Sequence, residues 1–464
     1  MFKKEIYTSR RERLVASMDE GIILMPGNNE APCNYPDNTY KFRQDSTFLY
    51  FFGIDQPGFA ATLDVDSGEA TIFGNDIDID DIIWMGPQPS VADQAAEVGV
   101  TKTAPTAQLE KVLKEAASKG RKIHFLPQYR HDNQIYLHEV LGVPFEGQKT
   151  SASEKLIRAI VAMRLVKEPC EIEEIDKACN LGYAMHMAAL KSMQLGMKEQ
   201  EVVAIMESVA AAGGPMVSFT TILSQHGETM HNHGHEAIIE DGKLLLVDAG
   251  CEISSHYCSD NTRTMPTGGK FTQKQADIYT IVSTANQFAL ENARPGVTYR
   301  DIHLGASKII VKGLSNLGLV HGDIDEMVEA GVQGLFMPHG LGHNMGLDVH
   351  DMENYGENLV GYDDDQTRAK QLGLGSLRMA RRLKPGNVIT DEPGIYFIPA
   401  LIEQWKSEGH NKQYINFDKL ESYYDFGGIR LEDDLLITAG GARLLGSRRL
   451  PITVKDVEEE MKNR

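Results

Sequence analysis

Four strand-like segments of this chain each carry a carboxylate that an apolar strand has no structural reason to keep. They are Asp248 in Leu-Leu-Leu-Val-Asp-Ala-Gly, Asp260 in Cys-Ser-Asp-Asn-Thr-Arg-Thr, Glu392 in Ile-Thr-Asp-Glu-Pro-Gly-Ile-Tyr and Glu432 in Gly-Ile-Arg-Leu-Glu-Asp-Asp. Removing an isolated carboxylate from water is very costly, so a buried one must be paired, protonated or bound to a metal. A fold that buries these strands therefore has to supply partners for all four.

Taken alone, each of these acidic residues also has an ordinary structural explanation. Asp248 can cap a turn, and Glu392 can precede a rigid Pro-Gly turn. Glu432 can pair with Arg430, two residues away on the same face of the strand. For any single residue this explanation is the stronger one, so the case for chemistry rests on the combination.

A histidine-containing segment rich in glycine lies between the second and third carboxylates. It reads Phe-Met-Pro-His-Gly-Leu-Gly-His-Asn-Met-Gly-Leu-Asp-Val-His and contains His339, His343 and His350. No G-x-G-x-x-G or Walker pattern with lysine accompanies it, which argues against a phosphate-binding loop. Carboxylates and histidine without a thiolate suit Mn, Co or Zn. Charge counting favours two dications, because one would leave the four carboxylates strongly anionic.

Length and composition exclude several other classes of protein. A chain of 464 residues exceeds what one hydrophobic core usually organises, so two or three domains are expected. The formal net charge of -20 opposes binding to nucleic acid or to an anionic membrane surface. No run of about 18 apolar residues is present to span a membrane. The five cysteines show no C-x-x-C spacing and no signal peptide is evident, so a reducing cytoplasm is expected.

Hydrophobic patterning predicts two regions of different character, with a boundary near residue 160. The first alternates short strands and helices and reads as a small α/β domain, with helices at 8–19 and 109–118 and strands at 21–25, 47–52, 60–65, 70–73 and 122–126. The second reads as α+β. Its helices are expected at 153–165, from Pro169, and at 198–212, 272–292 and 299–317, its strands at 217–223, 243–248, 387–397 and 428–438, and a solvated loop at 362–374.

In this order and context, one set of residues resembles the ligands of the dinuclear metallopeptidases of the methionine aminopeptidase, aminopeptidase P and prolidase family: Asp248, Asp260, His343, Glu392 and Glu432. The resemblance covers nearly the whole chain. Residues 42–53, followed by Pro57 and Gly58, are similar to the N-terminal domain shared by aminopeptidase P and prolidase, and residues 373–386 are closer to prolidase. The resemblance implies a creatinase/aminopeptidase P-type α/β N-terminal domain over residues 1–160 and an α+β catalytic domain of pita-bread fold over residues 161–464.

The resemblance also implies how the ligands divide between two metal ions. Asp248 would chelate one ion, and His343 and Glu392 would hold the other. Asp260 and Glu432 would bridge the two. Glu392 is further placed to handle the proton of the attacking water in a two-metal hydrolysis site. Mn²⁺ is the expected ion, with Co²⁺ or Zn²⁺ as alternatives.

Other residues receive roles around the scissile bond from the same resemblance. His231, in Glu-Thr-Met-His-Asn, would meet the scissile amide and help its nitrogen leave. His339 and His350 would line the pocket and stabilise the tetrahedral oxyanion. Arg430 would orient a ligand carboxylate from behind.

His231 also begins an alternating run with His233 and His235, which can share one strand face. No carboxylate or cysteine stands at a matching spacing. A separate metal site is therefore not favoured, and His231 alone is expected to be catalytic.

Two further residues concern specificity within the family. Arg378, fourteen residues before Glu392, falls where prolidase is expected to have a carboxylate-binding arginine, and a planar guanidinium suits bidentate capture. The alternative is a solvated arginine in a basic patch with Arg381 and Arg382. Trp84, in Ile-Ile-Trp-Met-Gly, resembles a prolidase tryptophan that reaches the neighbouring protomer's site, with packing inside the N-terminal domain as the alternative.

The chain departs from the family pattern near the first and third carboxylates. Asp248 and Asp260 are twelve residues apart, one more than is usual in the family, so a bulge or a longer hairpin turn must absorb a residue if Asp260 is to face the site. Asn261 and Asp391 stand where apolar residues are common. Asp391 should point away from Glu392, on the opposite strand face, and is not expected to bind metal.

The expected activity is hydrolysis of the bond between an N-terminal residue and a following proline. Proline's tertiary amide has no N–H, so peptidases that need that hydrogen bond fail on it and a dedicated pocket is required. Xaa-Pro dipeptidase is favoured over Xaa-Pro aminopeptidase acting on longer peptides, and a cytoplasmic homodimer is implied. Creatinase-type hydrolases and non-catalytic binding proteins of this fold are expected to have lost metal ligands, whereas all five candidates are present here.

Overall fold

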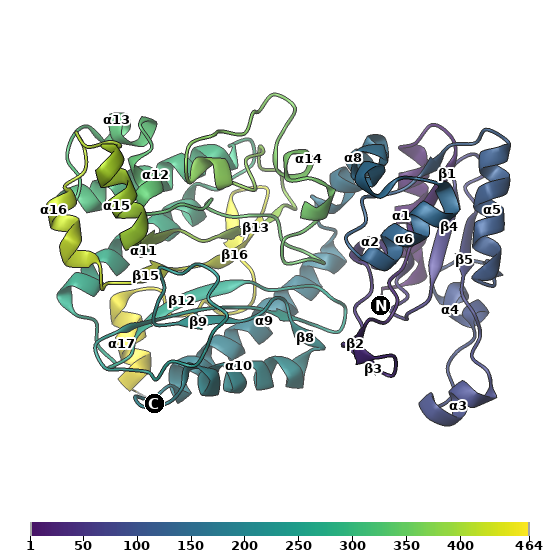
Figure 1. The fold of residues 1–464 in the computed structure, drawn as a ribbon, viewed down its shortest axis with the longest axis horizontal. Helices are drawn as coiled ribbons and strands as arrows, with labels where there is room; N and C mark the ends of the chain where they lie inside the picture. Colours follow the sequence, from purple (N-terminus) through teal and green to yellow (C-terminus); the bar gives the residue numbers. More distant parts are fainter. Residues whose placement is uncertain (1, 463–464) are drawn as a thin grey trace. The chain divides into compact units, whose positions relative to one another are not determined.

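The computed structural model describes residues 2–462, and the chain divides into two compact units (Figure 1). The first unit ends with helix α8 (Glu154–Arg164) and also takes in Asn354–Gly356. The second comprises the rest of the described chain from Leu165. The boundary predicted near residue 160 falls within α8, one turn before the division by contacts. Among the described residues, no helix combines the length and apolar character needed to cross a membrane.

The first unit is built on a mixed five-stranded sheet with strand order β6-β5-β4-β1-β7. Its strands are β1 (Ile22–Pro26), β4 (Ala60–Asp64), β5 (Ala70–Phe73), β6 (Lys102–Ala104) and β7 (Ile123–His124). β4 is antiparallel to β1 and β5, whereas β7 and β6 run parallel to β1 and β5. Alternation along β1 turns Ile22 and Leu24 toward one face of the sheet, where they pack with Leu109 and Leu113.

Helices surround this sheet, and a small hairpin stands apart from it. The helices are α1 (Lys4–Ala16), α2 (Ser46–Phe52), α3 (Ile79–Met85), α4 (Val91–Glu97), α5 (Ala107–Ser118), α6 (His131–Leu141) and α7 (Gln148–Ser151), and the hairpin is β2 (Pro32–Tyr35) with β3 (Asn38–Thr39). The α/β character predicted for this region is confirmed, and the helix predicted at 8–19 begins and ends a few residues earlier.

The strand predicted at residues 47–52 is wrong, because this segment forms helix α2. Asp45 caps it, since its side chain accepts hydrogen bonds from the backbone N–H groups of Thr47 and Phe48. Gly53 ends it in the left-handed conformation at φ 61°. Every side chain of the helix is buried, so the apolar run carries no helical periodicity that could distinguish it from a buried strand.

The second unit packs long helices around several short sheets that share one continuous hydrophobic core (Figure 1). The helices are α9 (Pro169–Ser192), α10 (Glu199–Gly213), α11 (Gln273–Asn292), α12 (Tyr299–Asn316), α13 (Ile324–Glu329), α14 (Glu357–Gly361), α15 (Pro399–Glu408), α16 (Phe417–Leu420) and α17 (Val454–Lys462). The strands pair as β9-β10-β12, β13-β16-β17, β14-β15 and β8-β11. Six of them are β8 (Met216–Val217), β9 (Ile222–Ser224), β10 (Leu244–Ala249), β11 (Cys251–Glu252), β12 (Asn261–Pro266) and β17 (Ala442–Leu444). The predicted α+β character is confirmed, and residues 362–373 contain no helix or strand, as expected of a loop.

Two of the predicted strands are interrupted at their carboxylates. Residues 387–397 form β13 (Val388–Asp391) and β14 (Gly394–Tyr396), separated by Glu392 and Pro393. Residues 428–438 form β15 (Gly428–Arg430) and β16 (Asp433–Ile437), separated by Leu431 and Glu432. Each half pairs in a different sheet, so both glutamates lie where the chain passes from one sheet to another.

Candidate metal centre

A cavity of about 530 Å³ in the second unit is lined by ten of the eleven residues to which the sequence assigns a role in the site. They are His231, Asp248, Asp260, His339, His343, His350, Arg378, Glu392, Arg430 and Glu432. Phe219, Ile222, Met230 and Val349 add an apolar portion to the wall. The cavity therefore combines acidic, histidine-bearing and apolar surface, and its volume is that of a small-ligand site.

The antiparallel hairpin of β10 and β12 places Asp248 and Asp260 on one face. Asp248 is paired with Thr262. The same register, continued by two residues toward the turn, places Gly250 opposite Asp260. The register continues without a bulge, because Ser259 N donates to Cys251 O and Glu252 bridges Cys258. Paired residues share a face and alternate residues repeat it, so both aspartates point to the same side.

The twelve-residue spacing of the two aspartates is accommodated by the turn at the end of this hairpin, with no bulge in the register before it. His256 lies there at φ 68°, and its backbone N–H donates to Ile253 O. A longer turn is one of the two solutions that the sequence left open.

The other three candidate ligands come from segments that lie against this hairpin or against each other. Glu432 N donates to Thr262 O, and Thr262 Oγ1 lies 2.7 Å from Glu432 Oε2. The glycine-rich stretch runs antiparallel to β13, with hydrogen bonds from Thr390 N to His343 O and from Glu392 N to Leu341 O. These backbone contacts bring His343, Glu392 and Glu432 to the face that Asp248 and Asp260 already occupy.

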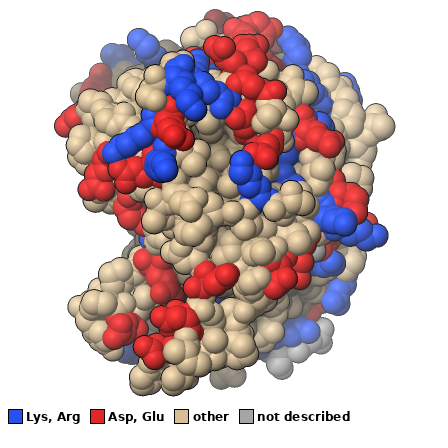
Figure 2. All heavy atoms as spheres, turned by 90° about the vertical axis from the view of Figure 1, so that its right-hand side faces the viewer, with Lys and Arg blue, Asp and Glu red and all other residues tan. Residues whose placement is uncertain are grey.

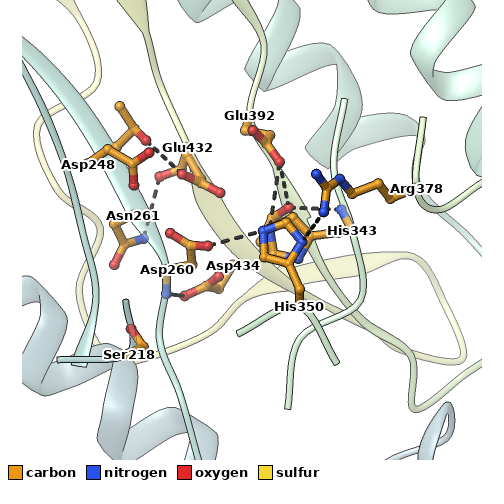
Figure 3. A network of polar contacts seen from close by, with 12 residues as sticks. Ser218, Asp248, Asp260, Asn261, His343, His350, Arg378, Glu392, Glu432 and Asp434 are labelled. Carbon is orange, nitrogen blue, oxygen red and sulfur yellow. Dashed lines mark hydrogen bonds and ion pairs between the residues drawn. The ribbon is translucent and has the colours of Figure 1, made fainter. Parts of the chain in front are cut away.

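The side chains converge closely, as Figure 3 shows. His343 Nε2 lies 3.4 Å from Asp260 Oδ2 and 3.7 Å from Glu392 Oε1. Ligand atoms of Asp260, His343 and Glu432 all lie within 4.8 Å of one another, and all three residues are buried. His343 Nδ1 is 3.0 Å from Asn344 O, so Nδ1 carries the proton and Nε2 is left with a lone pair facing the carboxylates.

Arg430 connects one candidate ligand to the histidine side of the cavity. Its Nη2 pairs with Asp248 Oδ2, and its Nη1 donates to the Tyr396 hydroxyl at 2.8 Å. That hydroxyl lies 2.9 Å from His339 Nε2, while His339 Nδ1 is 2.7 Å from Gly340 O. Arg430 thus pairs with Asp248 rather than with Glu432, the partner in the ordinary structural explanation of Glu432, and its role in orienting a ligand carboxylate stays a prediction.

Burial and mutual repulsion govern the ionisation of the site. Burial first, and then the charges of neighbouring carboxylates, raise the pKa of Asp260 and of Glu432 well above their ordinary values, and burial also raises the pKa of Glu392. Burial lowers the pKa of His339 to about 3 and that of His350 to about 4, so both rings are neutral near pH 7.

This donor set fits divalent cations. Asp248 Oδ1 and Asp260 Oδ1 are buried and have no hydrogen-bond partner among residues 2–462. Asp260, Glu392 and Glu432, whose charges repel one another, face the lone pair of His343 in a buried position. Positive charge placed among them would relieve the repulsion and give the unpartnered oxygens a ligand.

Several sequence-predicted residues lie elsewhere or behave differently. Trp84 is on α3 in the first unit and is 86% exposed, which rules out the alternative of packing within the N-terminal domain, and its role at a neighbouring subunit's site stays a prediction. His235 is buried, with Nδ1 3.0 Å from Leu223 O, whereas His233 lines the cavity beside His231. Asp391 is fully buried outside the cavity wall, as expected for the opposite strand face.

Asn261 and the arginines near Arg378 lie in different surroundings. Asn261 is buried, and its Nδ2 donates to Glu432 O at 3.4 Å. Arg381 and Arg382 pair with Asp363 and Asp365 outside the cavity, whereas Arg378 lines it, so Arg378 is not part of a common solvated patch.

Sequence reasoning missed three residues that contact the site. Tyr396 joins Arg430 to His339 and stands at an even spacing from Glu392, a period-two signal that was available. Asp434 Oδ2 accepts the backbone N–H of Asp260 at 3.0 Å. Glu353 contacts His350 and Arg378, although no periodicity or motif in the sequence singles it out.

Comparison with known proteins identifies the family. The sequence profile described as metallopeptidase family M24 matches residues 173–439, which is more than half of the chain. The chain belongs to metallopeptidase family M24. A second profile, the aminopeptidase P N-terminal domain, matches residues 7–124.

Individual M24 relatives cover almost the entire chain. It is 31% identical over 449 residues to the Xaa-Pro dipeptidase of Homo sapiens, covering 94% of this chain and 88% of the relative. It is 32% identical to the probable Xaa-Pro aminopeptidase pepP of Aspergillus niger, covering 97% of this chain and 95% of the relative. Among solved structures, Pseudomonas aeruginosa aminopeptidase PepP matches with a TM-score of 0.81 and 27% identity, covering 100% of this chain and 98% of that one.

Family membership confirms the predicted fold class and the general chemistry. The chain combines an aminopeptidase P-type N-terminal domain with a pita-bread catalytic domain. It is a metallopeptidase that depends on divalent metal ions, and the group formed by Asp260, His343 and Glu432 can hold one.

Proposed function

We propose that this metallopeptidase hydrolyses the bond between an N-terminal residue and a following proline, with Xaa-Pro dipeptides as its preferred substrates. The observation that carries the proposal is the convergence of Asp248, Asp260, His343, Glu392 and Glu432 on one peptide-sized cavity. The relatives named Xaa-Pro dipeptidase and Xaa-Pro aminopeptidase support the substrate class. Retention of all five ligand-type residues disfavours a metal-free creatinase-like hydrolase and a non-catalytic binding protein.

The proposed centre holds two divalent ions, with Mn²⁺ as the expected metal. Asp248 would hold one ion, His343 and Glu392 the other, and Asp260 and Glu432 both. Bound dications supply Lewis acidity, which lowers the pKa of water and polarises a carbonyl oxygen. Four carboxylates balance the charge of two dications, and the hydrogen bond from His343 Nδ1 to Asn344 O leaves Nε2 free to bind.

This chain's own residues handle the protons and position the substrate. Glu392 is the carboxylate proposed to accept the proton of the attacking water, and its Oε1 lies 3.3 Å from Thr390 Oγ1, which can hold it in place. His231 lines the cavity and is proposed to approach the nitrogen that leaves. His339, whose Nε2 faces Tyr396, and His350 are proposed to stabilise the oxyanion.

The apolar wall gives a physical reason for proline at the second position. Phe219, Ile222, Met230 and Val349 can receive the apolar pyrrolidine ring, which presents no N–H to be satisfied. Arg378 lines the same cavity and is proposed to receive the free carboxylate of a dipeptide. This assignment favours the dipeptidase, while the relatives named aminopeptidase favour longer peptides as the alternative.

A comparison of Gly-Pro with Gly-Pro-Gly in Mn²⁺-loaded enzyme tests the proposal. Release of glycine from both substrates with a higher kcat/KM for Gly-Pro is expected. A higher kcat/KM for the tripeptide would replace the dipeptidase by the aminopeptidase. No cleavage of either peptide, with cleavage of proline-free dipeptides, would refute the Xaa-Pro specificity.

The proposal includes a cytoplasmic homodimer in which Trp84 reaches the site of the neighbouring subunit. Trp84, Ile79, Ile83 and Met85 are exposed together on α3, which has no buried residue. Sedimentation and Gly-Pro kinetics of Trp84→Ala check this role. Loss of activity in a variant that still folds and dimerises is expected, and unchanged kinetics would remove Trp84 from the site.

A further inference from the structure

Glu353 is a largely buried carboxylate that contacts two residues of the cavity wall without lining the cavity itself. Its Oε2 lies 2.5 Å from Arg378 Nη1, and its Oε1 lies 2.9 Å from His350 Nδ1. The Glu353 side chain is 18% exposed, against 39% for Arg378. One acidic group therefore connects the histidine proposed for the oxyanion to the arginine proposed for the end of the substrate.

The contacts hold His350 Nδ1 between a donor and an acceptor. His350 Nδ1 lies 2.9 Å both from Arg378 Nη1, which can only donate, and from Glu353 Oε1. Burial opposes ionisation of Glu353, but the hydrogen bond with His350, the charge that this ring carries at low pH and the charge of Arg378 outweigh it and lower the pKa of Glu353 to about 2. Nδ1 can donate to Glu353 or accept from Arg378, but not both at once, so the two contacts fix the position of the His350 ring rather than its tautomer.

The same contacts change what Arg378 offers to a substrate. Its positive charge is paired with the negative charge of Glu353 through Nη1 alone. Its Nε and Nη2 have no hydrogen-bond partner within residues 2–462 and remain as donors, and the His350 ring lies beside the guanidinium (Figure 3). Arg378 can thus donate hydrogen bonds to a carboxylate or a carbonyl oxygen, but the ion pair leaves it little net charge with which to prefer the carboxylate.

We propose that Glu353 is a positioning residue that orients His350 and Arg378 and, by neutralising Arg378, limits the preference of the enzyme for substrates with a free carboxylate directly after proline. The inference rests on the proposed Xaa-Pro activity and adds which end groups the cavity accepts. Glu353 makes the arginine a hydrogen-bond donor suited both to a dipeptide's carboxylate and to the carbonyl oxygen of a longer or amidated peptide.

The charge balance is tested by comparing the kinetics of the wild-type enzyme on Gly-Pro and on Gly-Pro amide. These two substrates have nearly the same size and differ in the charge of the C-terminal end. Values of kcat/KM within about tenfold of each other are expected from a neutralised arginine. A preference of more than about a hundredfold for the free acid would overturn the inference, because it requires an uncompensated positive charge. Failure to cleave either compound would contradict the proposed function itself, which is a separate result.

Glu353→Gln removes the charge and keeps the size and one acceptor oxygen. The ratio of kcat/KM for Gly-Pro to that for Gly-Pro amide should rise about tenfold, through a lower KM for Gly-Pro. kcat should fall equally for both substrates, since His350 loses its anionic partner in both cases. The matched control is Glu357→Gln, which breaks the Glu357–Arg368 pair away from the cavity wall and should leave the ratio unchanged.

A double variant shows whether Glu353 changes the substrate ratio by acting on Arg378. Glu353→Gln added to Arg378→Ala should no longer change the ratio, because there is no charge left to release. An unchanged ratio in the single variant, or a change that persists without Arg378, would overturn the inference. Should Glu353→Gln fail to fold, the wild-type comparison of Gly-Pro with Gly-Pro amide still decides whether Arg378 is neutralised.

Discussion

Glu392 has two proposed tasks, as a metal ligand and as the carboxylate that takes the proton of the attacking water. Glu392→Gln keeps an oxygen that can bind metal but removes the basic carboxylate. We expect kcat for Gly-Pro to fall by about a hundredfold or more, while the metal content measured by mass spectrometry stays near that of the wild type. Substantial activity in this variant would contradict the assigned role.

His303 in α12 is a residue whose ionisation ties stability to pH. It is fully buried, neither ring nitrogen has a hydrogen-bond partner among the described residues, and burial lowers its pKa to about 4 from an ordinary 6.5. Between these values the unfolded chain binds a proton that the folded chain does not. The free energy of unfolding should therefore fall as the pH falls through this window, by up to about 1.4 kcal/mol per pH unit from this group.

Urea denaturation of His303→Leu at pH 5 and pH 7 checks this contribution. The difference in the free energy of unfolding between the two pH values should be smaller than in the wild type, because the leucine cannot take up the proton. Equal pH dependence in both proteins would show that His303 does not titrate as its burial implies.

Individual residues differ in how far the sequence alone could identify them. Four of the ligand-type residues stood out because acidic groups in apolar strands demand partners, and His343 stood out in its glycine-rich histidine segment; all five line one cavity. Tyr396 was missed although its spacing from Glu392 was visible. Glu353 and Asp434 could not be found this way, since their contacts with Arg378 and Asp260 are set by tertiary packing across long stretches of chain.

At the scale of elements, the hairpin between β10 and β12 carries the geometry of two candidate ligands. A Cβ at Gly250 would stand 1.8 Å from Ser259 O on the opposite strand, a backbone atom that can move only with its strand. Gly250→Ala should therefore destabilise the protein by about 1–3 kcal/mol and weaken metal binding through Asp260. Thermal melting and calorimetric titration with Mn²⁺ measure the two effects.

Gly440→Ala is the control for that substitution, because a Cβ at Gly440 meets no atom within 4 Å. Its melting temperature and Mn²⁺ affinity should match those of the wild type. Wild-type Mn²⁺ affinity in Gly250→Ala would mean that the close strand approach does not position Asp260.

Helices with clear periodicity were predictable as elements, whereas buried apolar segments were less so. The periodic helix expected at 109–118 appears as Ala107–Ser118. Residues 47–52 were misread because a completely buried helix lacks a polar face. The strands around Glu392 and Glu432 were predicted as continuous, since nothing in local propensity records that their halves pair in different sheets.

For the whole molecule, most of the acidic surplus lies outside the candidate centre. On the face drawn in Figure 2, acidic and basic side chains are interspersed. Exposed ion pairs such as Lys102–Glu69 and Arg158–Glu154 each contribute little to stability. The buried carboxylates around the cavity are therefore the acidic groups whose charge has the larger consequences.

Removal of metal should reveal those consequences as a loss of stability. Ions that bind only the folded chain stabilise it by about 2.7 kcal/mol at a hundredfold excess over Kd, and the buried carboxylates repel one another without them. Treatment with a chelator should lower the melting temperature by several degrees, and Mn²⁺ should restore it. Asp260→Asn should lose most of this difference, and a melting temperature insensitive to chelator would argue against metal at these residues.

The most direct test of the two-metal Xaa-Pro peptidase is a titration of chelator-treated protein with Mn²⁺ while proline release from Gly-Pro is followed. Activity should be absent at the start and should reach its maximum as two equivalents of Mn²⁺ are bound per chain. Full activity in the metal-free protein, or no release of proline once Mn²⁺ is saturating, would contradict the account.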